Sequence, residues 1–244
     1  MKVTEIQKQP HVVQPYVVIE GNVGSGKSTF LKLIQDYFAA QVVFEPHQQW
    51  QHEDSEYNLL DKFYTDTPRW AYTFQTYAFI TRVVTQEKHN RINPYAMQFL
   101  ERSVFSDRYC FTKNAYEQGH INNLEWKLYT EWFSWLVDGY VPKPTAFIYL
   151  QVDPKICFKR LQKRHRAEEA TVTLEYLEQL HDKHEQWLLK KEGVADYLHD
   201  VPVLTLVAGE DFESDRHVLE NHVAQIATFL HTTAGIMGEQ TDCG

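Results

Sequence analysis

The chain has 244 residues, of which 43% are hydrophobic and 23% charged, and these values are typical of a globular protein with one large core. Its formal net charge of −9 argues against a general nucleic-acid-binding protein. No apolar run approaches the roughly 18 residues of a membrane span. Cys110, Cys157 and Cys243 are odd in number and form no C-x-x-C pair, which favours a reducing compartment. We therefore expect a cytoplasmic protein that binds neither nucleic acid nor membranes.

Strands and helices alternate along the chain. Short apolar runs predict strands, and periodic apolar residues between them predict helices. Alternation of this kind predicts an α/β fold with a parallel sheet covered on both faces. We expect a loose N-terminal lead-in at 1–14, a single domain at 15–231 and a flexible C-terminal tail at 232–244. The predicted strands are 16–19, 41–44, 97–100, 145–152 and 203–207, and the predicted helices are 29–40, 57–64, 68–89, one around 126–135, one that starts at Pro154 after an Asp153 N-cap, 174–191 and 216–231.

The first predicted strand leads directly into the phosphate-binding P-loop pattern G-x-x-x-x-G-K-S, and a predicted helix follows it. Glycines let the backbone turn and approach a triphosphate closely, so that its N–H groups face the phosphate oxygens. Lys27 would reach the β- and γ-phosphates, and the Ser28 hydroxyl would bind Mg²⁺. The alternative is a glycine-rich turn that only packs a helix on a strand. The residues expected to bind ATP here are Gly21, Asn22, Val23, Gly24, Ser25, Gly26, Lys27, Ser28 and Thr29.

Charged residues follow the second and third predicted strands, where a ligand sits in an open α/β sheet. Glu45 ends the second strand and is a natural general base for an acceptor hydroxyl, although it could be a surface carboxylate. Arg102, after the third strand, could stabilise charge that develops during transfer or could simply form a salt bridge. Glu101 beside it could bind Mg²⁺ through water. The basic run at 159–166 could form a lid over the triphosphate, or could be a solvated helix face.

Six motifs, in order, resemble the deoxynucleoside kinase family, and most closely its deoxycytidine and deoxyguanosine kinase branch. The resemblance covers residues 17–229. It implies a P-loop NTPase-like five-stranded parallel sheet with helices on both faces and a helical lid. It also implies transfer of the ATP γ-phosphoryl group to a deoxynucleoside 5′-hydroxyl, and a homodimer formed through helices. The motifs are residues 21–30, Phe44-Glu45-Pro46 with Trp50, residues 74–77, Glu101-Arg102-Ser103 with Asp107-Arg108-Tyr109, residues 160–169 and residues 174–188.

The resemblance also implies roles for single residues. Glu45 would be the base and Arg102 the charge stabiliser, while Tyr64 and Glu169 would hold the sugar 3′-hydroxyl and Gln75 would read the base edge. The nucleobase would lie between aromatic rings. The expected catalytic set is Glu45, Arg102, Lys27, Arg164 and Arg166; Arg160, Arg164, Asp211 and Phe212 join the ATP site; and the nucleoside site holds Glu45, Trp50, Leu60, Tyr64, Phe74, Gln75, Arg82, Arg102, Asp107, Phe111 and Glu169. The helix with Trp126, Trp132 and Trp135 is a candidate dimer surface, with core packing as the alternative.

Arg82 and Asp107 match an Arg–Asp pair of the deoxycytidine and deoxyguanosine kinases. A carboxylate held by Arg can accept a hydrogen bond from an exocyclic amino group, whereas thymine offers only a carbonyl there. We hypothesise a preference for purine deoxynucleosides, with deoxycytidine as the close competitor. Ala78 is typical of the deoxycytidine branch and Phe79 of the deoxyguanosine branch. His47 departs from the family, which usually has a small apolar residue after Glu-Pro.

Two other classes of P-loop protein remain alternatives, and a third is excluded. A GTP-dependent switch would need an Asn-Lys-x-Asp segment, which the sequence lacks. A non-catalytic nucleotide-gated module would not depend on Glu45. A nucleoside monophosphate kinase would need a further cation near Glu45 to hold the acceptor's phosphate, and His47 is the one candidate.

Overall fold

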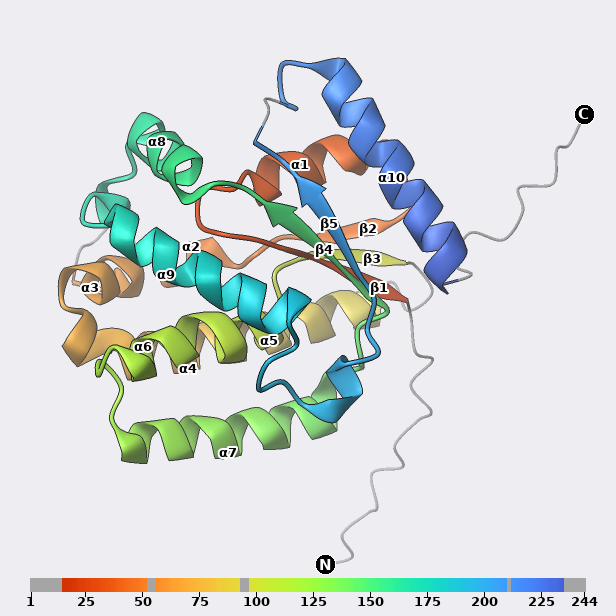
Figure 1. Cartoon of the computed structure of the whole chain (residues 1–244). Coiled ribbons are helices and arrows are strands. Elements are labelled where there is room, and N and C mark those ends of the chain that lie inside the picture. Colours follow the sequence, from red (N-terminus) through yellow and green to blue (C-terminus); the bar gives the residue numbers. More distant parts are fainter. Residues whose placement is uncertain (1–14, 52–55, 93–96, 210–211, 235–244) are drawn as a thin grey trace, which may run out of the picture.

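A computed structural model describes residues 15–51, 56–92, 97–209 and 212–234 (Figure 1). Its centre is a sheet of five parallel strands in the order β2-β3-β1-β4-β5. The predicted parallel sheet is therefore confirmed. The strands are β1 (Tyr16–Glu20), β2 (Gln41–Val43), β3 (Gln98–Glu101), β4 (Ala146–Gln151) and β5 (Val203–Val207).

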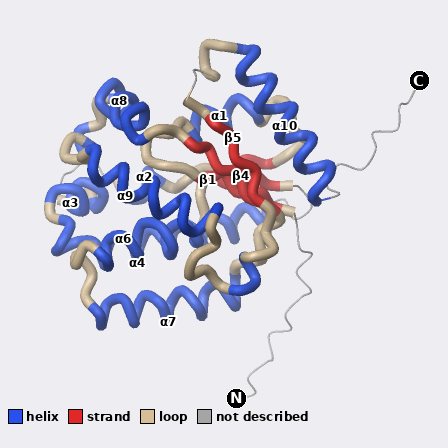
Figure 2. The backbone as a smooth tube through the Cα atoms, viewed as in Figure 1, coloured by secondary structure: helices blue, strands red, loops and turns tan. Residues whose placement is uncertain are grey.

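Helices cover both faces of this sheet, as Figure 2 shows. The helices of the described residues are α1 (Lys27–Ile34), α2 (His47–Trp50), α3 (Leu59–Thr65), α4 (Thr67–Ile92), α5 (Val104–Ser106), α6 (Lys113–Glu117), α7 (Asn123–Tyr140), α8 (Pro154–Arg164), α9 (Leu174–His184) and α10 (Arg216–Ala234). Two π-helical turns, Asp107–Thr112 and Glu185–Leu189, and two 3₁₀ turns, Ala167–Glu169 and Asp196–Leu198, complete the set.

Successive residues of each strand point to opposite faces and so feed two separate cores. On one face Val18 packs with buried side chains of α4, α7 and α9. On the other face Val17 and Ile19 pack with buried side chains of α1, α8 and α10. Because both faces are buried, the strands read as continuous apolar runs, and this is why they could be found in the sequence.

Several element boundaries differ from the prediction. Helix α1 ends at Ile34 rather than near residue 40, and α10 continues to Ala234, so residues 232–234 belong to a helix and not to the predicted tail. The lead-in at 1–14 and the rest of the tail lie outside the described residues. The predicted start of α8 is confirmed, since the Asp153 side chain accepts a hydrogen bond from the Lys155 amide with Pro154 in the first turn.

The helical segment that follows β3 was not predicted. Ser103 begins it with a capping box, in which its side chain accepts the Phe105 amide hydrogen bond and its own amide donates to Ser106 Oγ. The chain then passes through a π-helical turn into α6. This segment carries Asp107 and Phe111, which line one pocket together with residues of the P-loop. Among the described residues, no helix combines the length and the apolar character that crossing a membrane requires.

Candidate active site

The P-loop joins β1 to α1 at the carboxyl edge of the sheet. Gly24 has φ 78°, and a Cβ atom there would lie 2.7 Å from the Cys157 carbonyl oxygen, so only glycine fits. The Lys27 ammonium is buried and donates to the carbonyl oxygens of Gly21 at 3.0 Å and Asn22 at 2.6 Å. Burial, with Arg102 nearby, lowers the pKa of Lys27 to about 7. A bound polyanion would reverse that shift, as expected of a phosphate-binding lysine.

One pocket begins at the P-loop and runs between α3, α4 and α9. It brings together nearly all residues of the predicted site. The predicted residues that line it are Val23, Gly24, Gly26, Lys27, Ser28, Thr29, Glu45, Trp50, Leu60, Tyr64, Phe74, Gln75, Arg82, Glu101, Arg102, Asp107, Phe111, Arg164, Arg166 and Glu169.

Five predicted phosphate-site residues lie just outside this pocket. Gly21, Asn22 and Ser25 form the rest of the P-loop backbone. Arg160 Nη1 donates to the Ser25 carbonyl oxygen at 3.0 Å, and the Phe212 ring lies against Gly26. Arg160 and Phe212 therefore contact the P-loop without lining the pocket. Asp211 lies outside the described residues.

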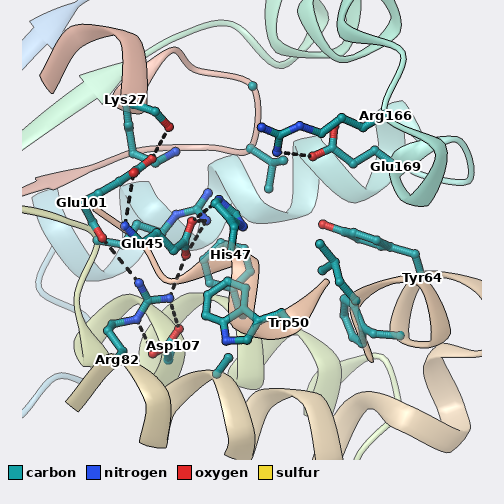
Figure 3. A pocket seen from close by; sticks show the side chains of 18 of the residues that line it. Lys27, Glu45, His47, Trp50, Tyr64, Arg82, Glu101, Asp107, Arg166 and Glu169 are labelled. Carbon is teal, nitrogen blue, oxygen red and sulfur yellow. Dashed lines mark hydrogen bonds and ion pairs between the residues drawn. The ribbon is translucent and has the colours of Figure 1, made fainter. Parts of the chain in front are cut away.

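A buried network of ions surrounds Glu45 (Figure 3). Arg82 donates to Asp107 through Nε at 2.8 Å and Nη2 at 3.0 Å, and the same Nη2 donates to Glu45 Oε1 at 2.8 Å. Arg102 Nη1 lies 3.1 Å from both Glu45 oxygens, and His47 Nε2 lies 2.9 Å from Oε2. Burial alone would raise the pKa of Glu45, but Arg102, His47 and Arg82 hold it well below its usual range. Glu45 is thus ionised and fixed in place.

Glu101 links this network to the P-loop. Its Oε1 accepts a hydrogen bond from Ser28 Oγ at 2.5 Å, and its Oε2 accepts one from the Glu45 amide at 3.3 Å. A hydroxyl and a carboxylate are oxygen ligands of the kind that Mg²⁺ prefers, so the pair fits this ion. Arg102, the next residue, has φ 61°, in the left-handed region. Neighbouring side chains of a regular strand point to opposite faces, and this turn lets Glu101 and Arg102 line the same pocket.

Two arginines and a glutamate meet at the rim of the pocket. Arg164, at the end of α8, donates to Glu169 Oε2 through Nε at 3.1 Å, and Arg166 Nη1 lies 3.6 Å from Glu169 Oε1. The two arginine side chains are about one-third exposed, whereas Glu169 is buried. The predicted lid arginines therefore line the pocket, and the single Glu169 carboxylate offsets part of their positive charge.

Aromatic rings form the deep end of the pocket. Trp50 and Phe74 meet edge to face at 5.6 Å, and Phe63 stacks on Phe74 at 4.6 Å. The Trp50 Nε1–H donates to Thr81 Oγ1 at 2.9 Å, which fixes the indole. Phe111 lies under the Arg102 guanidinium at 4.7 Å. Planar walls of this kind suit a flat heterocycle.

The family model described as "Deoxynucleoside kinase" matches residues 17–231. The chain belongs to the deoxynucleoside kinase family. It is accordingly a phosphotransferase that uses ATP to phosphorylate deoxynucleosides. The resemblance, the fold class and the enzyme class predicted from the sequence are confirmed.

Related proteins align with most of the length of this kinase. It is 40% identical to "Deoxycytidine kinase 2" of Gallus gallus over 88% of this chain and 89% of the relative. It is 40% identical to the mitochondrial deoxyguanosine kinase of Xenopus laevis over 81% and 82% of the two chains. For the deoxycytidine kinase of Homo sapiens the identity is 38% over 88% and 91%. The homodimer, the Mg²⁺ ion, the cytoplasmic location and the residue roles stay predictions.

Five further residues line the pocket of this kinase without having been assigned to the site: Lys32, His47, Phe63, Ala78 and Tyr176. Phe63 and Tyr176 lie on predicted amphipathic helices, where a pocket-facing ring has the same spacing as a core-facing one. Lys32 lies on α1 beyond the P-loop motif. Ala78 was noted only as a difference between branches of the family. His47 was noted as a departure from the family that would lie near the sugar or base. The sequence offered one signal for such residues: a position on the same helical face as a predicted site residue.

Proposed function

We propose that this kinase transfers the γ-phosphoryl group of Mg²⁺–ATP to the 5′-hydroxyl of a deoxynucleoside, with Glu45 as the general base. The observation that carries the proposal is the position of the buried, ionised Glu45 carboxylate in the pocket that begins at the P-loop. Glu45 accepts the hydroxyl proton, the 5′-oxygen bonds to the γ-phosphorus, and the bond to the β–γ bridging oxygen breaks, so that ADP leaves.

Other residues carry the charge of the transfer. Lys27 and the P-loop amides hold the β- and γ-phosphates, and Arg102, Arg164 and Arg166 stabilise the transferring group. Ser28 and Glu101 would hold Mg²⁺, which would supply positive charge to neutralise the phosphates. Tyr64 and Glu169 hold the sugar, and the rings of Trp50, Phe74 and Phe111 enclose the base, with Leu60 and Gln75 completing its site.

We propose a preference for purine deoxynucleosides, with deoxycytidine as the alternative. Asp107 is held in a two-point salt bridge with Arg82, so its carboxylate can accept from an exocyclic amino group while Arg82 serves N7 or O6. The relatives named above act on deoxycytidine and deoxyguanosine, which fits either outcome. The deciding experiment compares kcat/KM for the four natural deoxynucleosides with Mg²⁺–ATP. The highest kcat/KM for deoxyadenosine or deoxyguanosine supports the proposal. The highest kcat/KM for deoxycytidine or thymidine contradicts it.

Replacing Arg82 by Met and Asp107 by Ala together is expected to raise thymidine use relative to the purines. The reason is that the thymine carbonyl then no longer faces a buried carboxylate. Because Arg82 also contacts Glu45, the overall rate will fall, so the ranking of the four nucleosides is the readout. Arg91→Met, an exposed arginine of the same helix, is the matched control. An unchanged ranking would show that the pair does not read the base.

We propose that the kinase forms a homodimer through α7. The helix α7 exposes Leu124, Leu128, Trp132 and Trp135, which share one face of the helix. Trp132 and Trp135 are 51% and 57% exposed, whereas Trp126 stacks on Tyr116 at 4.6 Å and so belongs to the packing of the monomer. In Figure 1 the helix lies at the edge of the molecule, away from the sheet.

Replacing Trp132 and Trp135 together by Glu is expected to convert the dimer to a monomer, because two charges would have to be buried in the interface. Light scattering after size-exclusion chromatography measures the mass. Lys127→Glu, an exposed change on the same helix, is the control. A wild-type protein that is monomeric at micromolar concentration, or a dimer that survives the double change, would contradict this interface.

A further inference from the structure

Every hydrogen-bonding position of the Glu45 carboxylate is occupied in this structure. An ionised carboxylate offers about four lone-pair sites. Oε1 accepts from Arg82 Nη2 and Arg102 Nη1, and Oε2 accepts from Arg102 Nη1 and His47 Nε2. An acceptor hydroxyl that gives its proton to Glu45 must therefore replace one of these donors.

Of the three donors, His47 is the one that can leave. The side chains of Arg82 and Arg102 are 7% and 8% exposed, whereas that of His47 is 32% exposed and lines the pocket. Arg82 is also bound to Asp107, and Arg102 Nη2 also donates to the Gly21 carbonyl at 3.4 Å, so moving either arginine breaks several contacts.

The histidine, in contrast, is held at one nitrogen. Among the described residues, His47 Nδ1 is buried without a hydrogen-bond partner. Moving the imidazole therefore breaks only the bond to Glu45 and frees a nitrogen that is unsatisfied in the present position. His47 and Trp50 lie on the short helix α2, and their rings meet edge to face at 5.2 Å. A nucleobase that packs against Trp50 would consequently disturb His47 as well.

We propose that His47 blocks the acceptor position on Glu45 until a deoxynucleoside binds. This inference rests on the proposed role of Glu45 as the base. In the enzyme loaded with ATP alone, the imidazole takes the place where a water molecule would otherwise donate its proton to Glu45 Oε2. A water activated there would form a bond to the γ-phosphorus as the β–γ bridging bond breaks, yielding ADP and inorganic phosphate. His47 thereby suppresses this hydrolysis, and the nucleoside hydroxyl displaces it.

The block has a cost in substrate binding. A nucleoside that binds the wild-type enzyme exchanges the His47–Glu45 hydrogen bond for a new one from its hydroxyl. Without His47 the hydroxyl displaces only a water molecule, which regains its hydrogen bonds in bulk solvent. A hydrogen bond to a charged group contributes enough to change affinity by roughly tenfold or more.

His47→Val tests the proposal, since it places a small apolar residue of the kind usual in the family at this position. We expect hydrolysis of Mg²⁺–ATP without nucleoside to rise by about tenfold, and the KM for the nucleoside to fall by a similar factor, without a loss of kcat. His47→Gln, whose amide can still donate to Glu45, should stay close to the wild type. Gln49→Ala, an exposed change on the same helix, is the matched control.

The added hydrolysis must depend on the base, so His47→Val combined with Glu45→Gln should remove it. A fall in kcat for His47→Val would show that His47 orients the base or moves its proton, and a rise in KM would show that it holds the nucleoside. If hydrolysis and KM are unchanged, the acceptor hydroxyl displaces Arg102 rather than His47 from Glu45. Each of these results overturns the proposal. Nucleoside turnover that survives the single change Glu45→Gln, with His47 kept, would instead show that Glu45 is not the base.

Discussion

Lys27→Ala is expected to abolish phosphoryl transfer. The ammonium is the P-loop cation, and without it the charge on the β- and γ-phosphates has lost its fixed counterion in a buried site. Lys159→Ala, an exposed lysine of α8 that does not line the pocket, should leave the rate unchanged. Steady-state assays with saturating nucleoside measure the effect. Retained activity in Lys27→Ala would contradict the P-loop assignment.

The same lysine ties ATP binding to pH. In the empty site the pKa of Lys27 is about 7, because burial disfavours the charged form. Triphosphate oxygens favour the ammonium, so binding at pH 8 should take up a proton, and ATP affinity should fall as the pH rises above 7. Calorimetry in buffers of different ionisation enthalpy measures the uptake. Lys27→Ala should remove it, and a binding step in the wild type without proton uptake would show that the site is not desolvated as described.

Glu45→Gln is expected to lower kcat by roughly 10²–10⁴-fold while the protein still binds nucleoside. An amide cannot take the hydroxyl proton, although it keeps the shape of the side chain. Since the arginines hold the pKa of Glu45 well below its usual range, the wild-type carboxylate stays ionised through neutral pH. The wild-type rate should therefore not fall between pH 8 and pH 6 through protonation of this group.

Nucleoside binding by Glu45→Gln should be measured directly, for example by calorimetry, alongside kcat. Glu178→Gln, an exposed carboxylate of α9 outside the pocket, is the control. Near-normal turnover of Glu45→Gln would remove Glu45 as the base. Loss of nucleoside binding together with loss of the fold would point instead to a structural role, because the change leaves Arg82 and Arg102 without their shared anion.

The parts of the fold that the sequence predicts are those with a local cause. The P-loop motif fixes its own turn, and strands buried on both faces read as apolar runs without alternation. The segment after β3 lacked such a cause, since Asp107 to Thr112 form a π-helical turn, whose periodicity differs from that of an α-helix. Its position against α4 and α9 comes from packing between distant parts of the chain.

In the candidate site, too, some features follow from local sequence and others only from tertiary packing. Glu45 and Arg102 could be placed because they follow strands whose ends must meet in a parallel sheet. The Arg82–Asp107 pair was expected from the resemblance. The further bond from Arg82 to Glu45 could not be foreseen, because the relative rotation of the elements that carry these two residues is decided only by tertiary packing. The contact between His47 and Glu45 depends on the turn at Pro46, where the second strand gives way to α2. Charge alone would have paired these groups in several other ways.

The left-handed backbone at Arg102 costs the fold some stability. A non-glycine residue in this conformation gives up about 1–2 kcal/mol of folding free energy relative to a relaxed one. Glycine would relax the backbone at this position, but it would also remove a counterion of the buried Glu45 carboxylate. The backbone strain at Arg102 is therefore a cost that the fold carries in order to place a cation beside the buried Glu45 carboxylate.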